Sequence, residues 1–209
     1  MSGNFTPSQQ TNSVEREIVL DPRRTIISKT DPKGIIEYAN DYFIEISGYE
    51  EFELMGQPHS IIRHPDMPKV IFKLLWSKLK KGENIHALIK NRTKNGNYYW
   101  VITNFDIRYD DNGEIIAYYA QRKAAPDFAV YQIEKLYKTL RSIERAQGVG
   151  VAEKYLNGFL EERGLDYNEY VYNLLTIKKS EVKDYFDMSD TSRKAKKKKK
   201  SLFARLFKK

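Results

Sequence analysis

A cation, an imidazole and a carboxylate stand close together in the stretch RHPDMP, residues 63–68. Arg63 offers a planar fork of donors to phosphate or carboxylate oxygens, while His64 and Asp66 can exchange protons. The two prolines of the stretch stiffen the loop, and an apolar helix is expected directly after it. Three interpretations are open: a catalytic cluster, a ligand site, or a rigid loop in which Asp66 caps the helix.

Of these, catalysis has the least support in the rest of the sequence. There is no Gly-rich phosphate loop, no HExxH zinc motif and no nucleophile elbow. The chain has no cysteine, which excludes disulfides, thiolate metal sites and cysteine nucleophiles. His59 and His86 have no companions at metal-ligand spacing. We therefore expect no enzyme, no catalytic residue and no metal site.

The basic character of the chain belongs to its C-terminal end. Residues 193–209 contain ten of the 36 Lys and Arg and no acidic residue. The rest of the chain therefore has 26 basic and 28 acidic residues, a net charge of −2. Lysines lie beside apolar residues at helical spacing, a pattern that favours reversible binding to an anionic membrane. Nonspecific attraction to nucleic acid and a solvated end are the alternatives. The expected membrane-binding residues are Lys196, Lys197, Lys198, Lys199, Lys200, Leu202, Phe203, Leu206 and Phe207.

The pattern of apolar residues predicts a mixed α+β domain followed by helices. Extended runs at 25–31 and 35–40 precede short helices at 40–49 and 50–56 and a longer helix at 68–80. Three further extended runs are separated by the turns KNG and DNG, the strongest short-range signal of hairpins. Helical periodicity then dominates at 127–147, 151–164 and 166–177. The predicted organisation is a flexible N-terminus (1–15), an α+β domain (16–125), a helical extension (126–187) and a basic amphipathic tail (188–209).

Two long stretches carry a family resemblance. DPKGIIEYANDYFIEISGYEEFELMGQ, residues 31–57, and KNGNYYWV, residues 94–101, resemble a PAS domain, a small sensory fold. The more specific RHPDMPKVIFKLLWSKLKKGE, followed by IKNRTKNGNYYWV, is similar to the flavin-binding PAS domain of bacterial aerotaxis receptors. The resemblance covers roughly residues 16–125. It implies a five-stranded antiparallel sheet with short helices on one face.

The resemblance also implies FAD as cofactor, held between the sheet and those helices. Carried over residue by residue, it assigns FAD contacts to Arg63, His64, Asp66 and Trp76, and places Asn91 at the edge of the flavin ring. In the light-sensing relatives, a glutamine on the last strand faces the ring, and Gln121 matches it. A second ring asparagine of those relatives falls at Val101, so that contact is absent or comes from Asn104. Cysteinyl photochemistry is excluded because the chain has no cysteine.

Other interpretations remain open for the individual residues and for the cofactor. Asp66 is a good helix cap, and a tryptophan in the setting of Trp76 is usually part of a core. Haem is the rival cofactor, with His59, His64 and His86 as the only possible axial histidines. A cofactor-free PAS adaptor that only dimerises through its sheet is a further alternative.

With FAD bound, the expected function is to report redox, oxygen or respiratory state by protein contact. The expected partner is a chemotaxis-type receptor, and homodimerisation through the sheet or flanking helices is possible for this fold. The polar N-terminus lacks the order of a signal peptide, and no apolar run approaches the ~20 residues that span a bilayer. We expect a cytoplasmic protein at the inner face of the membrane, with no specific nucleic acid partner.

Overall fold

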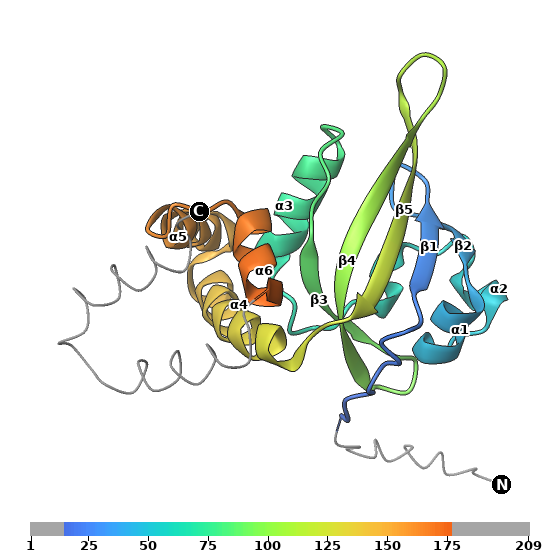
Figure 1. Ribbon diagram of the computed structural model, residues 1–209, viewed down its shortest axis with the longest axis horizontal. Coiled ribbons are helices and arrows are strands. Elements are labelled where there is room, and N and C mark those ends of the chain that lie inside the picture. The colour runs from blue at the N-terminus through green and yellow to red at the C-terminus, as the bar shows by residue number, and fades with distance from the viewer. Residues whose placement is uncertain (1–14, 177–209) are drawn as a thin grey trace, which may run out of the picture.

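A five-stranded antiparallel sheet forms the centre of the molecule (Figure 1). The computed structural model describes residues 15–176. The strands are β1 (Ile26–Thr30), β2 (Ile36–Ala39), β3 (Ala87–Arg92), β4 (Tyr98–Tyr109) and β5 (Ile115–Ala124), in the order β2-β1-β5-β4-β3. Every neighbouring pair is antiparallel. The prediction of an α+β fold with five antiparallel strands is confirmed.

Short helices connect β2 to β3 and cover one face of the sheet. They are α1 (Asp41–Ser47), α2 (Glu51–Leu54), the 3-10 helix η1 (His59–Ile62) and α3 (Lys69–Leu79). Asn40 begins α1, because its side-chain oxygen accepts a hydrogen bond from the backbone N–H of Phe43. Between these helices and the sheet lie fully buried residues such as Phe43 and Leu79. We call this side of the sheet the inner face.

Residues 16–20, which precede β1, form no regular strand. They make one isolated parallel bridge, between Glu17 and Tyr98, and Ile18 donates a backbone hydrogen bond to the Tyr98 carbonyl. This places the start of the described chain alongside the first residue of β4.

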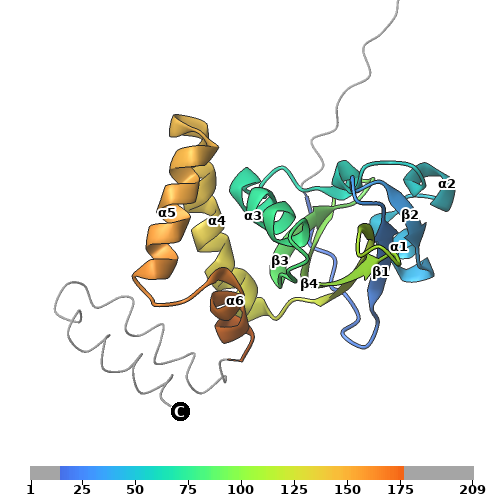
Figure 2. The same ribbon diagram turned by 90° about the horizontal axis from the view of Figure 1, so that it is seen from above.

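Three helices follow the sheet: α4 (Asp127–Gln147), α5 (Val149–Glu161) and α6 (Tyr167–Thr176). Figure 2 shows α4 and α5 side by side, next to α3. The Glu144 carboxylate of α4 accepts a hydrogen bond of 2.8 Å from the backbone N–H of Val70, at the start of α3. Among the described residues, no helix has the length and apolar character needed to cross a membrane.

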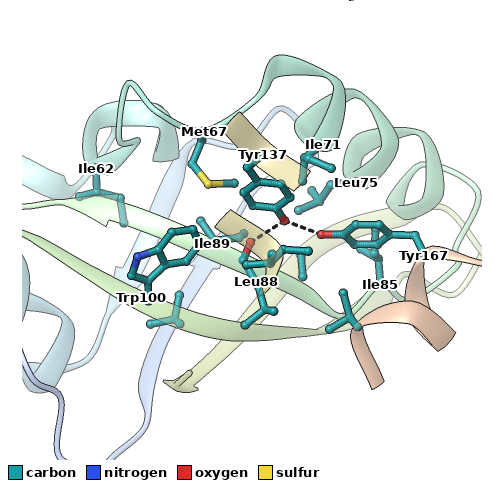
Figure 3. Packing of buried hydrophobic residues seen from close by; sticks show 14 of the residues in the cluster. Ile62, Met67, Ile71, Leu75, Ile85, Leu88, Ile89, Trp100, Tyr137 and Tyr167 are labelled. Carbon is teal, nitrogen blue, oxygen red and sulfur yellow. Dashed lines mark hydrogen bonds between the residues drawn. The ribbon is translucent and has the colours of Figure 1, made fainter. Parts of the chain in front are cut away.

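The C-terminal helices also cover the edge of the sheet. β3 is an edge strand, and the Tyr137 hydroxyl of α4 donates a hydrogen bond of 2.8 Å to the Leu88 carbonyl (Figure 3). Asn168 of α6 pairs with the backbone N–H of His86 and with the carbonyl of Asn84. Tyr137 also stacks on Trp100, with ring centroids 6.2 Å apart. An uncovered strand edge invites pairing with other chains, so these helices protect the sheet.

Candidate functional site: a cavity on the inner face of the sheet

A cavity of about 310 Å³ lies between the inner face of the sheet and the helices η1 and α3. Volumes of roughly 300–1,000 Å³ are typical of small-molecule sites. Its walls combine aromatic and aliphatic side chains with a few polar ones. The lining residues are Thr30, Lys33, Gly34, Pro58, His59, Ser60, Arg63, Phe72, Lys73, Leu75, Trp76, Leu79, Ile89, Asn91, Phe105, Tyr118, Ala120 and Arg122.

Strand alternation decides which side chains reach the cavity. Successive residues of a strand point to opposite faces of the sheet. On β3, Ile89 and Asn91 line the cavity, while Lys90 between them points to the other face. On β5, Ala120 and Arg122 line the cavity, which places Gln121 on the other face.

The charges around the cavity are of one sign. Four of its lining residues are Lys or Arg, and none is Asp or Glu. Lys73 is paired with Glu153 of α5 at 2.6 Å, whereas Arg122 forms no ion pair with any described residue. Such a lining favours a ligand that carries negative charge.

Three of the residues predicted from the sequence meet in this cavity. Arg63, the residue that follows η1, and Asn91 of β3 are held side by side by an isolated antiparallel backbone bridge. The Arg63 guanidinium lies 4.0 Å above the ring of Phe72 and donates to the Met67 carbonyl, and burial lowers its pKa. Trp76 projects from α3 and meets Tyr118 edge to face, with ring centroids 5.7 Å apart. Gly34 makes room for it, because a Cβ there would lie 2.9 Å from the Trp76 ring.

Asn91 is buried, and its amide nitrogen Nδ2 has no hydrogen-bond partner among the described protein atoms. The hydroxyl of Tyr99 on the neighbouring strand makes a weak hydrogen-bonding contact with the Asn91 side chain, which opposes the effect of burial on the pKa of Tyr99. This contact lies outside ordinary hydrogen-bond geometry, so neither the hydroxyl nor Nδ2 has a full partner among the described residues. Buried polar groups are nearly always satisfied, so an unpaired amide on a cavity wall indicates a missing partner. A ligand with an acceptor atom at that wall would supply it.

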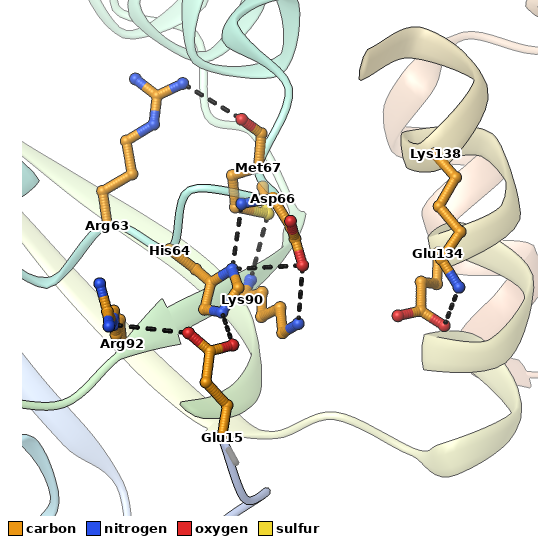
Figure 4. Close-up of polar contacts among 9 residues, drawn as sticks. All are labelled: Glu15, Arg63, His64, Asp66, Met67, Lys90, Arg92, Glu134 and Lys138. Carbon is orange, nitrogen blue, oxygen red and sulfur yellow. Dashed lines mark hydrogen bonds and ion pairs between the residues drawn. The ribbon is translucent and has the colours of Figure 1, made fainter. Parts of the chain in front are cut away.

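His64 and Asp66 are not brought into the cavity, contrary to the expectation from the sequence. Figure 4 shows Arg63 and His64 leaving the loop in different directions. His64 is 1% exposed; its Nδ1 accepts from the backbone N–H of Asp66, and its Nε2 lies 3.1 Å from the Glu15 carboxylate. The Asp66 carboxylate pairs with Lys90 at 3.1 Å on the outer side of β3. The adjacency of these residues in the loop is the physical reason: neighbouring side chains diverge.

Glu15, His64, Asp66 and Lys90 form a polar cluster, the His64 cluster, on the outer side of β3. Burial, reinforced by the nearby charge of Lys90, lowers the pKa of His64, although Glu15 opposes the shift. A neutral imidazole with Nδ1 as acceptor must carry its proton on Nε2, where it donates to Glu15. Asp66 and Lys90 also line a second cavity of about 400 Å³ beside α4. The cluster therefore fastens the loop and the N-terminal segment to the sheet.

Asn104 and Gln121 are also outside the inner cavity. They are paired across β4 and β5, and both lie on the outer face. Asn104 accepts a hydrogen bond of 2.7 Å from Asn84, and Gln121 is exposed. The structure therefore does not bring them to the inner cavity, and each is one residue away from an inward position, because a one-residue shift moves a strand side chain to the opposite face. Arg122 occupies the inward position on β5.

Arg122 and His59 also line the cavity, and the sequence analysis assigned neither of them to the flavin site. Arg122 donates to the Ser28 hydroxyl at 2.9 Å and to Nε2 of His59 at 2.8 Å, so this histidine is an acceptor and neutral. Part of His59 reaches solvent, yet its imidazole is surrounded by protein atoms, and this burial, followed by the charge of Arg122, lowers its pKa well below the ordinary value. Strict alternation along YYAQRK would have indicated Arg122; no sequence pattern indicated His59.

Comparisons with known proteins agree with this geometry. Residues 36–120 match the family model described as PAS fold. The aerotaxis receptor of Escherichia coli is 45% identical over 118 residues, which are 56% of this chain and 23% of the receptor. The biofilm dispersion protein BdlA of Pseudomonas aeruginosa is 23% identical over 57% of this chain and 28% of its own. Sporulation kinase C of Bacillus subtilis is 24% identical over 84% of this chain and 41% of its own.

Solved structures with a similar fold include light-oxygen-voltage domains. One, studied with a flavin analogue, has a TM-score of 0.49 at 20% identity, covering 54% of this chain and 87% of that domain. The dark structure of the blue-light photoreceptor Aureochrome1 has a TM-score of 0.46 at 21% identity, covering 57% of this chain and 86% of that one.

The chain aligns with 41% or less of the length of each of these curated relatives, so the similarity concerns a single region of larger proteins. The five-stranded sheet, the connecting helices between β2 and β3 and the matched residues together identify this part of the molecule: the chain contains a PAS domain, similar in sequence to that of the aerotaxis receptor.

Proposed function

We propose that the PAS domain binds a flavin, in the form of FAD, in the inner cavity and reports its redox state to a signalling partner. The single observation that carries the proposal is the wall at Asn91: a buried, unpartnered amide in a cavity with four cationic residues and no acidic one. A flavin ring edge has hydrogen-bond acceptors, and the phosphates of FAD are anionic. The high identity with an aerotaxis receptor points to the same ligand class.

The cavity suits the ring system of FAD, while a whole dinucleotide is larger than 310 Å³. The remainder would extend toward solvent, where the exposed residues Lys33 and Lys73 stand at the cavity wall. The guanidinium of Arg63 presents a planar set of donors that suits phosphate oxygens. Phe72, Trp76 and Tyr118 supply the aromatic surface against which a flat ring system packs.

A bound flavin would supply reversible two-electron redox chemistry. The protein's part is to exclude water, orient the ring and respond to its change of charge. Asn91 would donate a hydrogen bond to an acceptor of the flavin, and Trp76 would supply an aromatic wall of the cavity from α3. A change at Asn91 has a short route to the exterior, because β3 also carries Leu88, whose carbonyl receives the hydroxyl of Tyr137 from α4. We infer that α4 transmits the signal to a chemotaxis-type receptor.

Haem fits the cavity less well. His59 is the one histidine among the residues that line it, and an axial ligand needs a free ring nitrogen. Nε2 of His59 already accepts hydrogen bonds from Arg122 at 2.8 Å and lies 3.3 Å from the Ser28 hydroxyl. His64 is bound to Glu15 outside the cavity.

The absorption spectrum of the purified full chain tests the proposal. The expected result is the two-band visible spectrum of a protein-bound flavin, with FAD identified by mass after heat release. A Soret band would instead establish haem. A colourless protein that takes up no added FAD would favour the cofactor-free adaptor.

A further inference from the structure

Arg122 is a buried cation without an anionic partner. The residue is 4% exposed, yet none of the described carboxylates lies within ion-pair distance of its guanidinium. Its partners are neutral: the Ser28 hydroxyl at 2.9 Å and Nε2 of His59 at 2.8 Å. Fully buried arginines are rare and are normally paired, because an uncompensated buried charge is strongly unfavourable.

Burial lowers the pKa of Arg122 to about 10, which still leaves the guanidinium charged at neutral pH. Its neighbour cannot offset the charge, since His59 is held neutral and acts as an acceptor. A guanidinium has five N–H donors, and two hydrogen bonds to side chains are formed here. The protein thus retains both positive charge and donor capacity on the wall of the inner cavity.

We propose that Arg122 is the counter-ion for negative charge on the ligand of this cavity, and that with flavin bound it favours the reduced, anionic form. This inference rests on the proposed function. Oxidised flavin that gains two electrons and one proton carries one negative charge on its ring. A cation on the cavity wall therefore stabilises the reduced form more than the neutral oxidised form, and raises the midpoint potential.

The thermal stability of the cofactor-free protein provides a second, independent test, because a buried unpaired charge is unfavourable. Replacing Arg122 by methionine removes the uncompensated cation while keeping an unbranched side chain. The two partners it leaves can satisfy each other, because the Ser28 hydroxyl already lies 3.3 Å from Nε2 of His59 and can donate to it. Arg122→Met should therefore leave the thermal midpoint of the cofactor-free protein unchanged or higher.

The neighbouring residue provides a matched control. Lys123 carries the same charge on the same strand, but it is exposed and lies on the outer face. Lys123→Met removes one positive charge with no change inside the cavity. Arg122→Lys keeps the buried charge and loses the planar fork, and Arg122→Gln keeps neutral donors in case the methionine variant fails to fold.

The test is a spectroscopic titration with dithionite of the full chain loaded with FAD. For Arg122→Met, or for Arg122→Gln in its place, we expect at least a tenfold loss of preference for the reduced form, a fall of about 30 mV for a two-electron couple. The midpoint potentials of Arg122→Lys and Lys123→Met should stay close to that of the unaltered protein. An unchanged potential in a neutral Arg122 variant that retains FAD would overturn this inference alone. Absence of FAD binding by the unaltered chain would overturn the proposed function and this inference with it.

Discussion

At the scale of single residues, the direction of a side chain matters more than its chemical type. Asn91 and Asn104 are both strand asparagines that the sequence marks as ligand candidates. Asn91 lines the inner cavity with an unpartnered amide, whereas Asn104 lies on the outer face and is bonded to Asn84. The two residues form a natural pair for a test.

Asn91→Ala should weaken the binding of FAD by about fivefold, since the loss of one hydrogen bond costs about 1 kcal/mol and a tenfold change in affinity is about 1.4 kcal/mol. Equilibrium titration that follows the quenching of flavin fluorescence measures this. Asn104→Ala is the control and should bind FAD as the unaltered protein does. Equal losses for both variants would contradict the assignment of the inner face.

The two buried histidines predict how stability depends on pH. The pKa of His59 and that of His64 are lowered in the folded protein, chiefly by burial, while in the unfolded chain they titrate near 6.5. Unfolding therefore takes up protons below that pH. The free energy of unfolding should be constant above about pH 6.5 and fall toward pH 5, by up to about 1.4 kcal/mol per pH unit for each histidine.

Urea unfolding of the protein without FAD, at several pH values between 7.5 and 5, measures that dependence. His64→Gln should reduce the slope by up to one proton, because the variant has no titratable group where burial and the charge of Lys90 disfavour a charged imidazole. A slope that is the same in this variant and in the unaltered protein would show that His64 does not contribute.

The sequence allowed some site residues to be predicted and not others. Arg63, Trp76 and Asn91 were identified through the family motif, and the structure brings them to one cavity. His64 and Asp66 belong to the same motif but diverge from Arg63, because side-chain direction in an irregular loop is set by distant partners such as Glu15 and Lys90. Gln121 lies outside the cavity for a simpler reason. The family resemblance placed the ligand contact one residue before the inward-facing Arg122, and a shift of one residue moves a strand side chain to the opposite face.

At the scale of elements, the helices after the sheet supply hydrogen-bond partners for the free edge of β3. The hydroxyl of Tyr137 joins the Leu88 carbonyl and the hydroxyl of Tyr167, so a single atom connects α4, α6 and β3 (Figure 3). Periodicity predicted these helices as amphipathic. Their place against β3 could not be predicted, because the contacts join residues 30 and 49 positions apart through individual polar atoms.

Tyr137→Phe should lower the free energy of unfolding by about 1–2 kcal/mol, since it leaves a buried carbonyl and a buried hydroxyl without their partner. Urea denaturation provides the measurement. Tyr172→Phe in α6 is the control, because Tyr172 is 64% exposed, and it should change stability by less than about 0.5 kcal/mol. Equal stability of the two variants would mean that Tyr137 does not fasten α4 to the sheet.

At the scale of the whole molecule, the sequence predicted the fold class and the five-stranded sheet correctly because local signals are consistent along the chain. The Asn-Gly turns, the alternating runs and the apolar helix after Pro68 all point to one arrangement. The basic tail lies outside the described residues, and its attachment to membranes remains a prediction from composition.

Removal of residues 193–209 should release the protein from anionic vesicles, since each basic residue contributes about 1 kcal/mol at such a surface. Co-sedimentation with vesicles rich in phosphatidylserine, compared with neutral vesicles, measures the effect. If the full chain fails to pellet with the anionic vesicles at physiological salt, the proposed membrane attachment is wrong.

We propose that the inner cavity binds one FAD per chain through its flavin ring. Titration of FAD into the cofactor-free full chain tests it most directly when paired with Ala120→Leu, which adds bulk to a small residue of the cavity wall. We expect one FAD per chain for the unaltered protein and a loss of binding in Ala120→Leu, with the fold retained. No saturable binding, or the same binding in both proteins, would contradict it.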